Sequence, residues 1–387
     1  MSMARLTLIA ATLFGGAMGA CAQPHYTWQV YDMHSAGARD SEGFGVSRAG
    51  ASGNIGWSIQ PERSGASLWM GSEAMWLLLA EEESIYLPGI RGADADKQCG
   101  YDTPDDRAFA ALWFGTRDSV VHLHPGDPYY VSEVRDVFGD MAVGNAALRG
   151  RDHAAVWTAG DPPVMVDLHY GSANNSYARA TDGRWQGGSS GLSAVLWKGT
   201  PESMVVMEPP GYCCGPINGM ALNPDGTGTQ VGTLMTRDQF DNLRDHAVLW
   251  HDTPESWIDM HPPSSPGTNS YMWGTTGTIH CGQVSGRARI WFGDDPDSFL
   301  DIHQFIDPPP TGASRAVDID VYDGQIHIAG RATYEIDGRV VTHAIVWIGT
   351  PEGGRPGGAA AVPGGPEAPK PALKPARPAA PAGRGVD

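Results

Sequence analysis

The chain has 387 residues and a formal net charge of −18 at pH 7, with a sequence pI of about 5.0. Because an excess of negative charge repels phosphate backbones, we expect no nucleic-acid partner. After the first residues, no apolar run approaches the roughly 20 residues that a membrane-spanning helix needs, so no membrane span is expected.

The N-terminus has the pattern of an export signal. Arg5 precedes a short apolar run at residues 6–14, which is followed by small residues. Ala20 and Ala22 suit ordinary signal cleavage. The residues before Cys21 match a lipoprotein box only in part; in that alternative Cys21 would carry a lipid anchor. We expect simple cleavage and secretion, to the periplasm or the cell exterior.

The C-terminal segment has a different composition from the rest of the chain. Residues 353–387 are almost entirely Pro, Ala and Gly with scattered Lys and Arg, a composition that cannot bury a core. We therefore predict three regions: a signal peptide at 1–22, a folded body at 23–352, and a disordered tail at 353–387.

One phrase, typified by AVLWKGTPES, returns seven times in the body. Seven of the 13 tryptophans occupy the same position in it, namely Trp69, Trp113, Trp157, Trp197, Trp250, Trp291 and Trp347. Ahead of the tryptophan most units have a glycine, at Gly56, Gly100, Gly144, Gly232, Gly282 and Gly330. Short β-rich runs and turn formers, at a period of roughly 40 to 45 residues in most units, predict β-propeller blades of four antiparallel strands.

The two ends of the body predict how the ring closes. The seventh unit lacks a fourth strand, whereas residues 28–34 precede the first unit and match the outer-strand pattern, since Asp32-Met33-His34 repeats Asp259-Met260-His261. We therefore predict an all-β, seven-bladed β-propeller whose last blade is closed by an N-terminal strand. The alternatives are a six-bladed ring with one aberrant unit and a ring with an irregular first unit.

The repeat resembles the HAF-type repeats of exported bacterial proteins. The resemblance rests on His246–Trp250, with Gln230–Gly232 ahead of it, and on His343–Trp347, and the repeat pattern spans most of residues 28–350. The chain departs from the pattern where it has Val or Ile in place of Phe, and Leu-His-Pro in place of Leu-Gly. The resemblance implies no specific activity.

Repeated Asp-x-His pairs suggest either metal ligands or braces of the blades. Residues two apart on a strand share a face, so each pair can present two ligands. The pairs recur in separate blades at the outer strand, which favours hydrogen bonds internal to each blade. They are Asp32 and His34, Asp167 and His169, Asp259 and His261, and Asp301 and His303, with His122 and His124 as a variant.

Aromatic residues outside the repeat are candidates for a ligand surface, although ordinary packing is the competing interpretation. They are Trp57, Trp76, Trp185, Trp273, Tyr129, Tyr130 and Tyr271. A distant resemblance to a calcium loop is found at Asp318, Asp320 and the Asp323-Gly324 turn. Asp94 and Asp96 have the same spacing as Asp318 and Asp320 elsewhere in the chain. Their spacing does not fit an EF-hand, and Asp-Gly is typical of a hairpin turn.

Four cysteines follow the signal, without metal-ligand spacing. Cys99 and Cys281 occupy equivalent positions in the second and sixth units, so we expect them to lie too far apart to pair. Cys213 and Cys214 are adjacent, in the inner-strand region of the fifth blade. They form either a strained vicinal disulfide or two buried thiols.

The repeat accounts for most chemically distinctive residues, and no G-x-S-x-G or H-E-x-x-H motif is present. We therefore predict a monomeric, non-enzymatic scaffold that binds a protein, glycan or envelope component through loops on one face, where the connections 235–244 and 333–341 rise. No catalytic, cofactor-binding or metal-binding residue is assigned. The alternative is a hydrolase, lyase or lactonase with a site in the central channel, built from Glu133, Arg135, Asp136, Arg179, Arg315 and Asp318.

Overall fold

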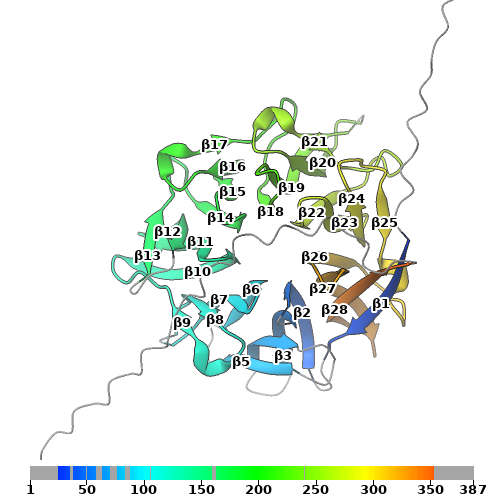
Figure 1. Ribbon diagram of the computed structural model, residues 1–387, viewed down its shortest axis with the longest axis horizontal. Helices are drawn as coiled ribbons and strands as arrows, with labels where there is room; N and C mark the ends of the chain where they lie inside the picture. The colour runs from blue at the N-terminus through cyan, green and yellow to red at the C-terminus, as the bar shows by residue number, and fades with distance from the viewer. Residues whose placement is uncertain are drawn as a thin grey trace, which may run out of the picture.

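The computed structural model describes residues 25–34, 38–48, 50–57, 63–69, 76–82, 88–104, 106–158, 163–238 and 240–352. They form seven four-stranded antiparallel sheets around a central axis (Figure 1). The predicted seven-bladed β-propeller is therefore confirmed, and the six-bladed alternative is wrong. The signal peptide at 1–22 and the tail at 353–387 lie outside the described residues.

Each blade runs from an innermost strand at the axis to an outermost strand at the rim. The first blade consists of β2 (Ala38–Ser47), β3 (Gly50–Trp57), β4 (Arg63–Trp69) and β5 (Trp76–Glu82). The second consists of β6 (Gly89–Asp94), β7 (Lys97–Asp102), β8 (Phe109–Trp113) and β9 (Val121–His122). The third consists of β10 (Tyr129–Phe138), β11 (Met141–Leu148), β12 (Arg151–Thr158) and β13 (Val164–Asp167). The fourth blade consists of β14 (Ser176–Thr181), β15 (Gln186–Ser190), β16 (Ser193–Trp197) and β17 (Val205–Val206). The fifth consists of β18 (Ile217–Leu222), β19 (Gly228–Arg237), β20 (Leu243–Trp250) and β21 (Ile258–Asp259). The sixth consists of β22 (Ser270–Thr275), β23 (Ile279–Val284), β24 (Arg287–Phe292) and β25 (Phe299–Asp301).

The seventh blade contains both ends of the body. Its strands are β26 (Ser314–Tyr322), β27 (Gln325–Ile336), β28 (Arg339–Pro351) and, outermost, β1 (Tyr26–Asp32). The register runs from Tyr26 opposite Pro351 to Asp32 opposite Ile345, and Figure 1 shows blue β1 beside orange β28. The predicted closure by an N-terminal strand is confirmed, and it covers an edge that β28 would otherwise expose.

Helical structure is limited to single turns of 3-10 helix among the described residues. They are η1 (Arg117–Ser119), η2 (Pro201–Ser203), η3 (Pro254–Ser256) and η4 (His303–Phe305). Two of them, η2 and η3, are formed by the Pro-Glu-Ser residues of the repeated phrase. No helix in the described ranges is long and apolar enough to cross a membrane.

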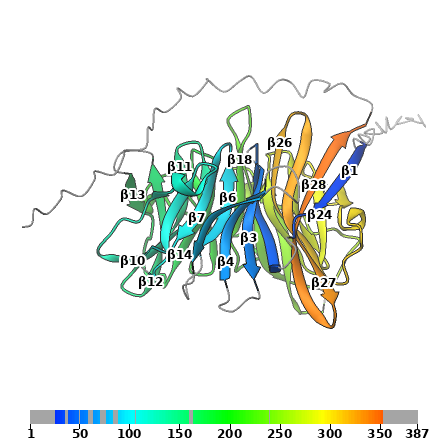
Figure 2. The same cartoon turned by 90° about the horizontal axis from the view of Figure 1, so that it is seen from below.

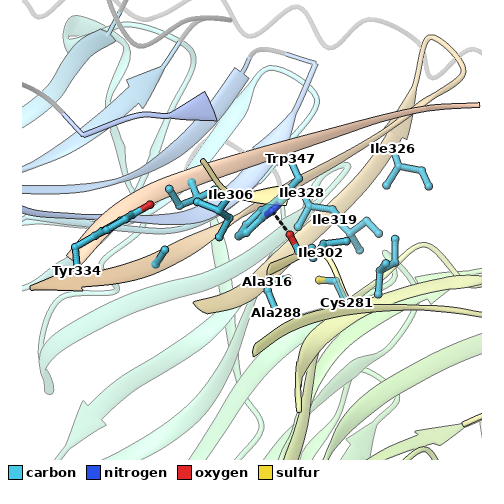
Figure 3. Packing of buried hydrophobic residues seen from close by; sticks show 13 residues of the cluster. Cys281, Ala288, Ile302, Ile306, Ala316, Ile319, Ile326, Ile328, Tyr334 and Trp347 are labelled. Carbon is cyan, nitrogen blue, oxygen red and sulfur yellow. Dashed lines mark hydrogen bonds between the residues drawn. The ribbon is translucent and has the colours of Figure 1, made fainter. Parts of the chain in front are cut away.

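The seven repeat tryptophans form the core between neighbouring blades. Each of them is at most 1% exposed. Trp347 packs among residues of the sixth and seventh blades and donates its Nε1–H to the Ile302 carbonyl at 3.0 Å (Figure 3). Trp250 makes the equivalent bond to the Met207 carbonyl at 2.9 Å. The repeat tryptophans are therefore core residues that pack where neighbouring blades meet.

The Asp-x-His pairs connect blades as well as bracing them. Asp167 accepts a bond from His153 of its own blade at 2.7 Å, as we had predicted. His169, however, bonds through Nδ1 to Ser176 Oγ at 2.8 Å, and Ser176 begins the inner strand of the next blade. The Ser176 hydroxyl also accepts the Ala154 N–H at 2.9 Å. The prediction that these bonds stay within one blade is therefore wrong for the second histidine.

The same inter-blade bond, which we call the His–Ser link, occurs at five junctions among the described residues. It joins His34 to Ser41, His124 to Ser132, His169 to Ser176, His261 to Ser270 and His303 to Ser314. Between the fourth and fifth blades Glu208 takes the place of the histidine and accepts the Cys214 N–H at 3.1 Å. The repeated histidines are thus structural residues that fix the angle between neighbouring blades.

The His–Ser link makes a pH-dependent contribution to stability. His261 donates its Nε2–H to the Ser265 carbonyl at 3.0 Å, so neutral Nδ1 accepts from Ser270 at 2.9 Å. Burial, followed by the charge of His246, lowers the pKa of His261 below its usual value. As pH falls below about 6.5, His261 becomes protonated in the unfolded chain before it does in the folded chain. The contribution of the His–Ser link to the free energy of unfolding is therefore lost toward acid pH.

We therefore expect the wild-type advantage in Tm over His261→Gln to be largest above about pH 6.5 and to shrink by pH 5. Differential scanning calorimetry of both proteins from pH 5 to pH 8 measures this difference. A pH-independent difference would show that His261 acts only through its shape and packing.

Candidate ligand-binding site in the central channel

Every inner strand contains an irregularity at the same place. A β-bulge interrupts the ladder between the first and second strands of each blade, leaving one residue unpaired. A bulge re-aims the side chain of its extra residue. All seven bulged residues line a central cavity of about 1240 Å³, and they are Phe44, Arg91, Arg135, Arg179, Asn218, Trp273 and Val317.

The repeated glycine explains where the bulge forms. It lies on the second strand, where a Cβ atom would stand 1.8–2.3 Å from a carbonyl oxygen of the inner strand or of the residue just before it. These glycines are Gly100, Gly144, Gly188, Gly232, Gly282 and Gly330. In the first blade the equivalent residue is Gly53, opposite Gly43, and not Gly56 as the sequence suggested. Only glycine allows the inner strand to approach this closely.

Five arginines line the cavity, and two glutamates bond to three of them. Glu133 binds both Arg91 and Arg135, the latter at 3.1 Å. Glu42 binds Arg331 of β27. Positive and negative side chains therefore alternate along the wall formed by the seventh, first, second and third blades, in the order Arg331, Glu42, Arg91, Glu133 and Arg135. The remaining two arginines, Arg179 and Arg315, have no acidic side chain in contact among the described residues.

Arg179 and Arg315 are held against aromatic rings. The Arg179 guanidinium lies 6.0 Å from the centre of the Tyr177 ring, and that of Arg315 lies 4.3 Å from the Trp273 ring. Tyr271 stacks on Trp273 with 5.4 Å between ring centroids and 10° between their planes. A cation over an aromatic face is attracted to it, and the Arg135 guanidinium also lies near the Tyr177 ring, at 5.7 Å from its centre.

Both arginines lie in environments that disfavour their charge. Burial and then the neighbouring Arg135 lower the pKa of Arg179 to about 10. Burial and then Arg331, which stands directly opposite on β27, lower the pKa of Arg315. The Nε atoms of Arg179 and Arg315 are buried without an acceptor. An anionic group bound at each guanidinium would relieve these unfavourable effects.

Two aspartates follow the bulge and line the same cavity. Asp136 Oδ2 accepts the Thr181 N–H at 2.8 Å, and Asp318 Oδ2 accepts the Val46 N–H at 2.9 Å. Each bond reaches the inner strand of the next blade. Burial raises the pKa of Asp136 to about 7 and that of Asp318 to about 8. These carboxyls connect blades at the level of the cavity.

The six residues of the channel alternative therefore do gather near the axis. Five of them line the cavity, and Glu133 bonds to two of the lining arginines. Sequence reasoning missed Arg91, Arg331, Glu42, Phe44 and Asn218. Phe44, Arg91 and Asn218 stand at the bulge, whose position becomes visible only when the strands are paired. Glu42 and Arg331 stand at paired positions and are brought to the site by the bond between them.

The aromatic candidates divide into several environments. Trp273 lines the cavity and Tyr271 stacks on it. Trp185 lies under the cations of Arg184 and Lys198, while the Tyr129 hydroxyl donates to Asp167 at 3.1 Å. Tyr130 is exposed and lies 5.4 Å from the Arg107 guanidinium. The side chains of Trp57 and Trp76 lie outside the described part of the structure.

The four cysteines of the body are free thiols. Cys99 and Cys281 are buried at equivalent places in β7 and β23, as predicted. Cys213 is half-buried and pairs through its backbone with Met235, and Cys214 adopts a left-handed conformation with a φ of 58°. A hydrogen bond between the two side chains, which favours the protonated Cys214 thiol, is the main cause that raises the pKa of Cys214 above its usual value.

The calcium alternative finds no support in the described ranges. No three His, Cys, Asp or Glu side chains there are grouped so that they could hold a metal ion. Asp320 Oδ1 accepts the Val321 N–H at 2.7 Å, and Asp323-Gly324 forms the predicted turn, with positive φ at both residues.

Comparison with known proteins adds little to this description. No family model and no curated protein matches the chain. A chain from a crystal structure of a nidogen/laminin complex is 10% identical, with a TM-score of 0.37, over 62% of this chain and 90% of that chain. The tricorn protease is 11% identical, with a TM-score of 0.31, over 79% of this chain and 34% of its own. The fold assignment rests on the seven sheets themselves.

Proposed function

We propose that the chain is a binding protein that holds an organic anion in its central channel. The observation that carries the proposal is that Arg179 and Arg315, two of the five arginines in the cavity wall, contact no acidic side chain among the described residues. The acidic residues that also line the cavity are Asp94, Asp136, Asp318, Asp320 and Glu352.

The cost of this arrangement supports a ligand over a structural role. Burying a cation without a counter-charge is unfavourable, and like charges directly opposite on paired strands repel. Arg315 and Arg331 are such a pair. Arg135 and Arg179 occupy equivalent bulges in neighbouring blades. A site that is destabilising when empty and satisfied when filled is typical of a binding site.

The placement of the site refines the scaffold prediction. The connections 235–244 and 333–341 belong to the β19–β20 and β27–β28 hairpins. Both rise on the face where the inner strands begin, because Ile217 pairs with Gly232 and Ser314 with Ala332. Figure 2 shows the β27–β28 hairpin projecting beyond the ring. The cavity lining instead extends to Pro224, Thr276 and Gly324, in the turns at the opposite ends of the inner strands, so these hairpins rise on the other face of the ring.

Export by the signal peptide, a monomeric state and membership of the HAF-type repeat proteins are parts of the same proposal. An anionic glycan or metabolite outside the cell fits the predicted location. The chemistry of the site requires carboxylate, sulfate or phosphate groups, because these accept paired hydrogen bonds from guanidinium.

Arg179→Gln tests the proposal, because binding and structural roles predict opposite results. We expect the ligand-free variant to have a Tm about 2 °C higher than wild type, since the substitution removes an unpaired buried cation. We also expect it to lose the Tm increase that anions give to the wild-type protein. Thermal-shift assays with glutarate, trigalacturonate and inorganic phosphate measure both effects, with neutral cellotriose as the control ligand.

Arg117→Gln is the matched control variant, because Arg117 is exposed on η1, away from the channel. It should keep the wild-type response to anions. The proposal is overturned if none of the anions raises the Tm of the wild-type protein, or if Arg179→Gln lowers the ligand-free Tm and leaves the anion response intact.

A second candidate function is a hydrolase, lyase or lactonase in the same channel. The specific observation is that Asp136 and Asp318 line the cavity with pKa values of about 7 and about 8, which suit a general acid at neutral pH. Their bonds to Thr181 and Val46 give them a structural task as well. Turnover of trigalacturonate that is lost in Asp318→Asn would favour the enzyme.

A further inference from the structure

We propose that the ligand is a dianion with its acidic groups at opposite ends, one bound by Arg179 and the other by Arg315. This inference rests on the proposed function and specifies the ligand of the same site. It follows from where the two unmatched cations lie in the ring and from how each is held.

The two arginines occupy opposite walls of the channel. Arg179 lies on β14 of the fourth blade and Arg315 on β26 of the seventh. In a ring of seven, these blades are separated by two blades on one side and by three on the other. Figure 1 shows β14 and β26 facing each other across the axis. One small anion in contact with Arg179 would therefore leave Arg315 uncompensated.

The other three lining arginines each bond to a glutamate. On the longer arc, Arg91 and Arg135 share Glu133. At the seventh blade, where this arc ends, Glu42 bonds to Arg331. On the shorter arc the bulged residues are Asn218 and Trp273, which are neutral. Arg179 and Arg315 are therefore the two lining arginines without a carboxylate partner among the described residues.

The surroundings of the two arginines share one feature. On β14 and on β22 a tyrosine stands two residues before the bulge and donates its hydroxyl to an aspartate of the preceding blade: Tyr177 to Asp152 at 2.9 Å, and Tyr271 to Asp245 at 2.8 Å. Tyr177 shares β14 with Arg179, and its ring lies near the guanidinium groups of both Arg179 and Arg135. Tyr271 lies one blade before Arg315 and stacks on Trp273, whose ring contacts the Arg315 guanidinium.

The supports around Arg179 extend to its neighbour. Asp152 also accepts the Asn145 amide at 3.1 Å, and Asn145 accepts Arg135 Nε at 3.2 Å. Arg135 thus donates to Glu133 and Asn145. Of the two cavity-lining arginines on β10 and β14, Arg179 is the one that bonds to no carboxylate among the described residues. A rigidly held guanidinium suits bidentate recognition of a carboxylate.

Two such positions favour a ligand whose length spans the channel. Once one acidic group is bound, the second binds as an intramolecular event, and a matched span typically raises affinity about 100-fold or more. We therefore expect affinity to depend on the distance between the acidic groups and to pass through a maximum. A linear dicarboxylate meets these requirements in their simplest form.

Isothermal titration calorimetry on the purified chain tests the inference, with α,ω-dicarboxylates of four to eight carbons and monocarboxylates of equal length. We expect the best dicarboxylate to bind about 100-fold more tightly than its monocarboxylate. Arg179→Gln and Arg315→Gln should each reduce dicarboxylate binding to the monocarboxylate level. Arg179→Lys, which keeps the charge, should retain part of the affinity, and Arg117→Gln should bind like wild type.

The outcomes separate this inference from the proposed function. If dicarboxylates and monocarboxylates bind equally at every length, the two-position inference is wrong while the anion site stands. If no anion binds, the proposed function itself fails. Circular dichroism and Tm of each variant show whether it is folded, so that a loss of binding is read only from folded protein.

Discussion

Replacing Gly188 by alanine is expected to prevent the fourth blade from forming. The added Cβ would stand 1.9 Å from the Tyr177 carbonyl oxygen, and the next contacts are also backbone atoms of the inner strand. No side-chain rotation relieves this clash, so β14 must move away from β15. We expect a loss of more than about 4 kcal/mol of stability, seen as a Tm at least about 8 °C lower or as insoluble protein.

Gly199→Ala is the matched control in the same blade. Gly199 has a φ of 87°, and a Cβ there would meet nothing within 4 Å. Only the left-handed conformation is penalised, at a cost of about 1–2 kcal/mol. Equal effects of the two substitutions would show that the close approach of β14 to β15 is not what requires Gly188.

The repeat made the architecture predictable from sequence. Trp347 and its six equivalents stand at one position because each must fill the same wedge between blades, so the fold imposes the same residue seven times. The missing fourth strand of the last unit and the Asp32-Met33-His34 phrase predicted closure by β1. Patterns of this kind are local in sequence, which is why they could be recognised without the structure.

The site was predicted only in part, because its residues are the ones that break the repeat. Bulged positions hold arginine in the second, third and fourth blades but Phe44, Asn218, Trp273 and Val317 in the others, so no single residue type marks them. The repeated glycine follows the bulge by nine residues in most blades, as from Arg135 to Gly144, but by 14 residues from Asn218 to Gly232 and by 13 from Val317 to Gly330.

Charge matching within the site was beyond sequence reasoning. The bond between Glu42 and Arg331 joins residues almost 300 positions apart (|i−j| = 289), and the opposition of Arg315 and Arg331 depends on strand register. The six residues expected in a channel site did reach the axis. That Arg179 and Arg315 are the two arginines without an acidic side chain in contact could be recognised only from the positions of their neighbours in the structure.

Removing residues 25–34 is expected to open the ring, and adding them back as a peptide is expected to close it. The deletion exposes the full edge of β28 from Ile345 to Pro351, and it removes the links that His34 makes to Ser41 and Asp32 makes to His343. We expect the truncated chain to lose at least about 10 °C in Tm and to aggregate, since an unpaired edge strand recruits other chains.

A synthetic peptide of residues 25–34 should bind the truncated chain and restore the Tm, because stability rises with the concentration of a partner that binds only the folded state. A scrambled peptide of the same composition serves as the control and should not. Trp28 packs on Phe305 with 5.9 Å between ring centroids, so a peptide with Trp28→Ala should rescue more weakly. If the truncated chain keeps the wild-type Tm without peptide, β1 is not what closes the propeller, and the inter-blade links alone hold the seventh blade against the first.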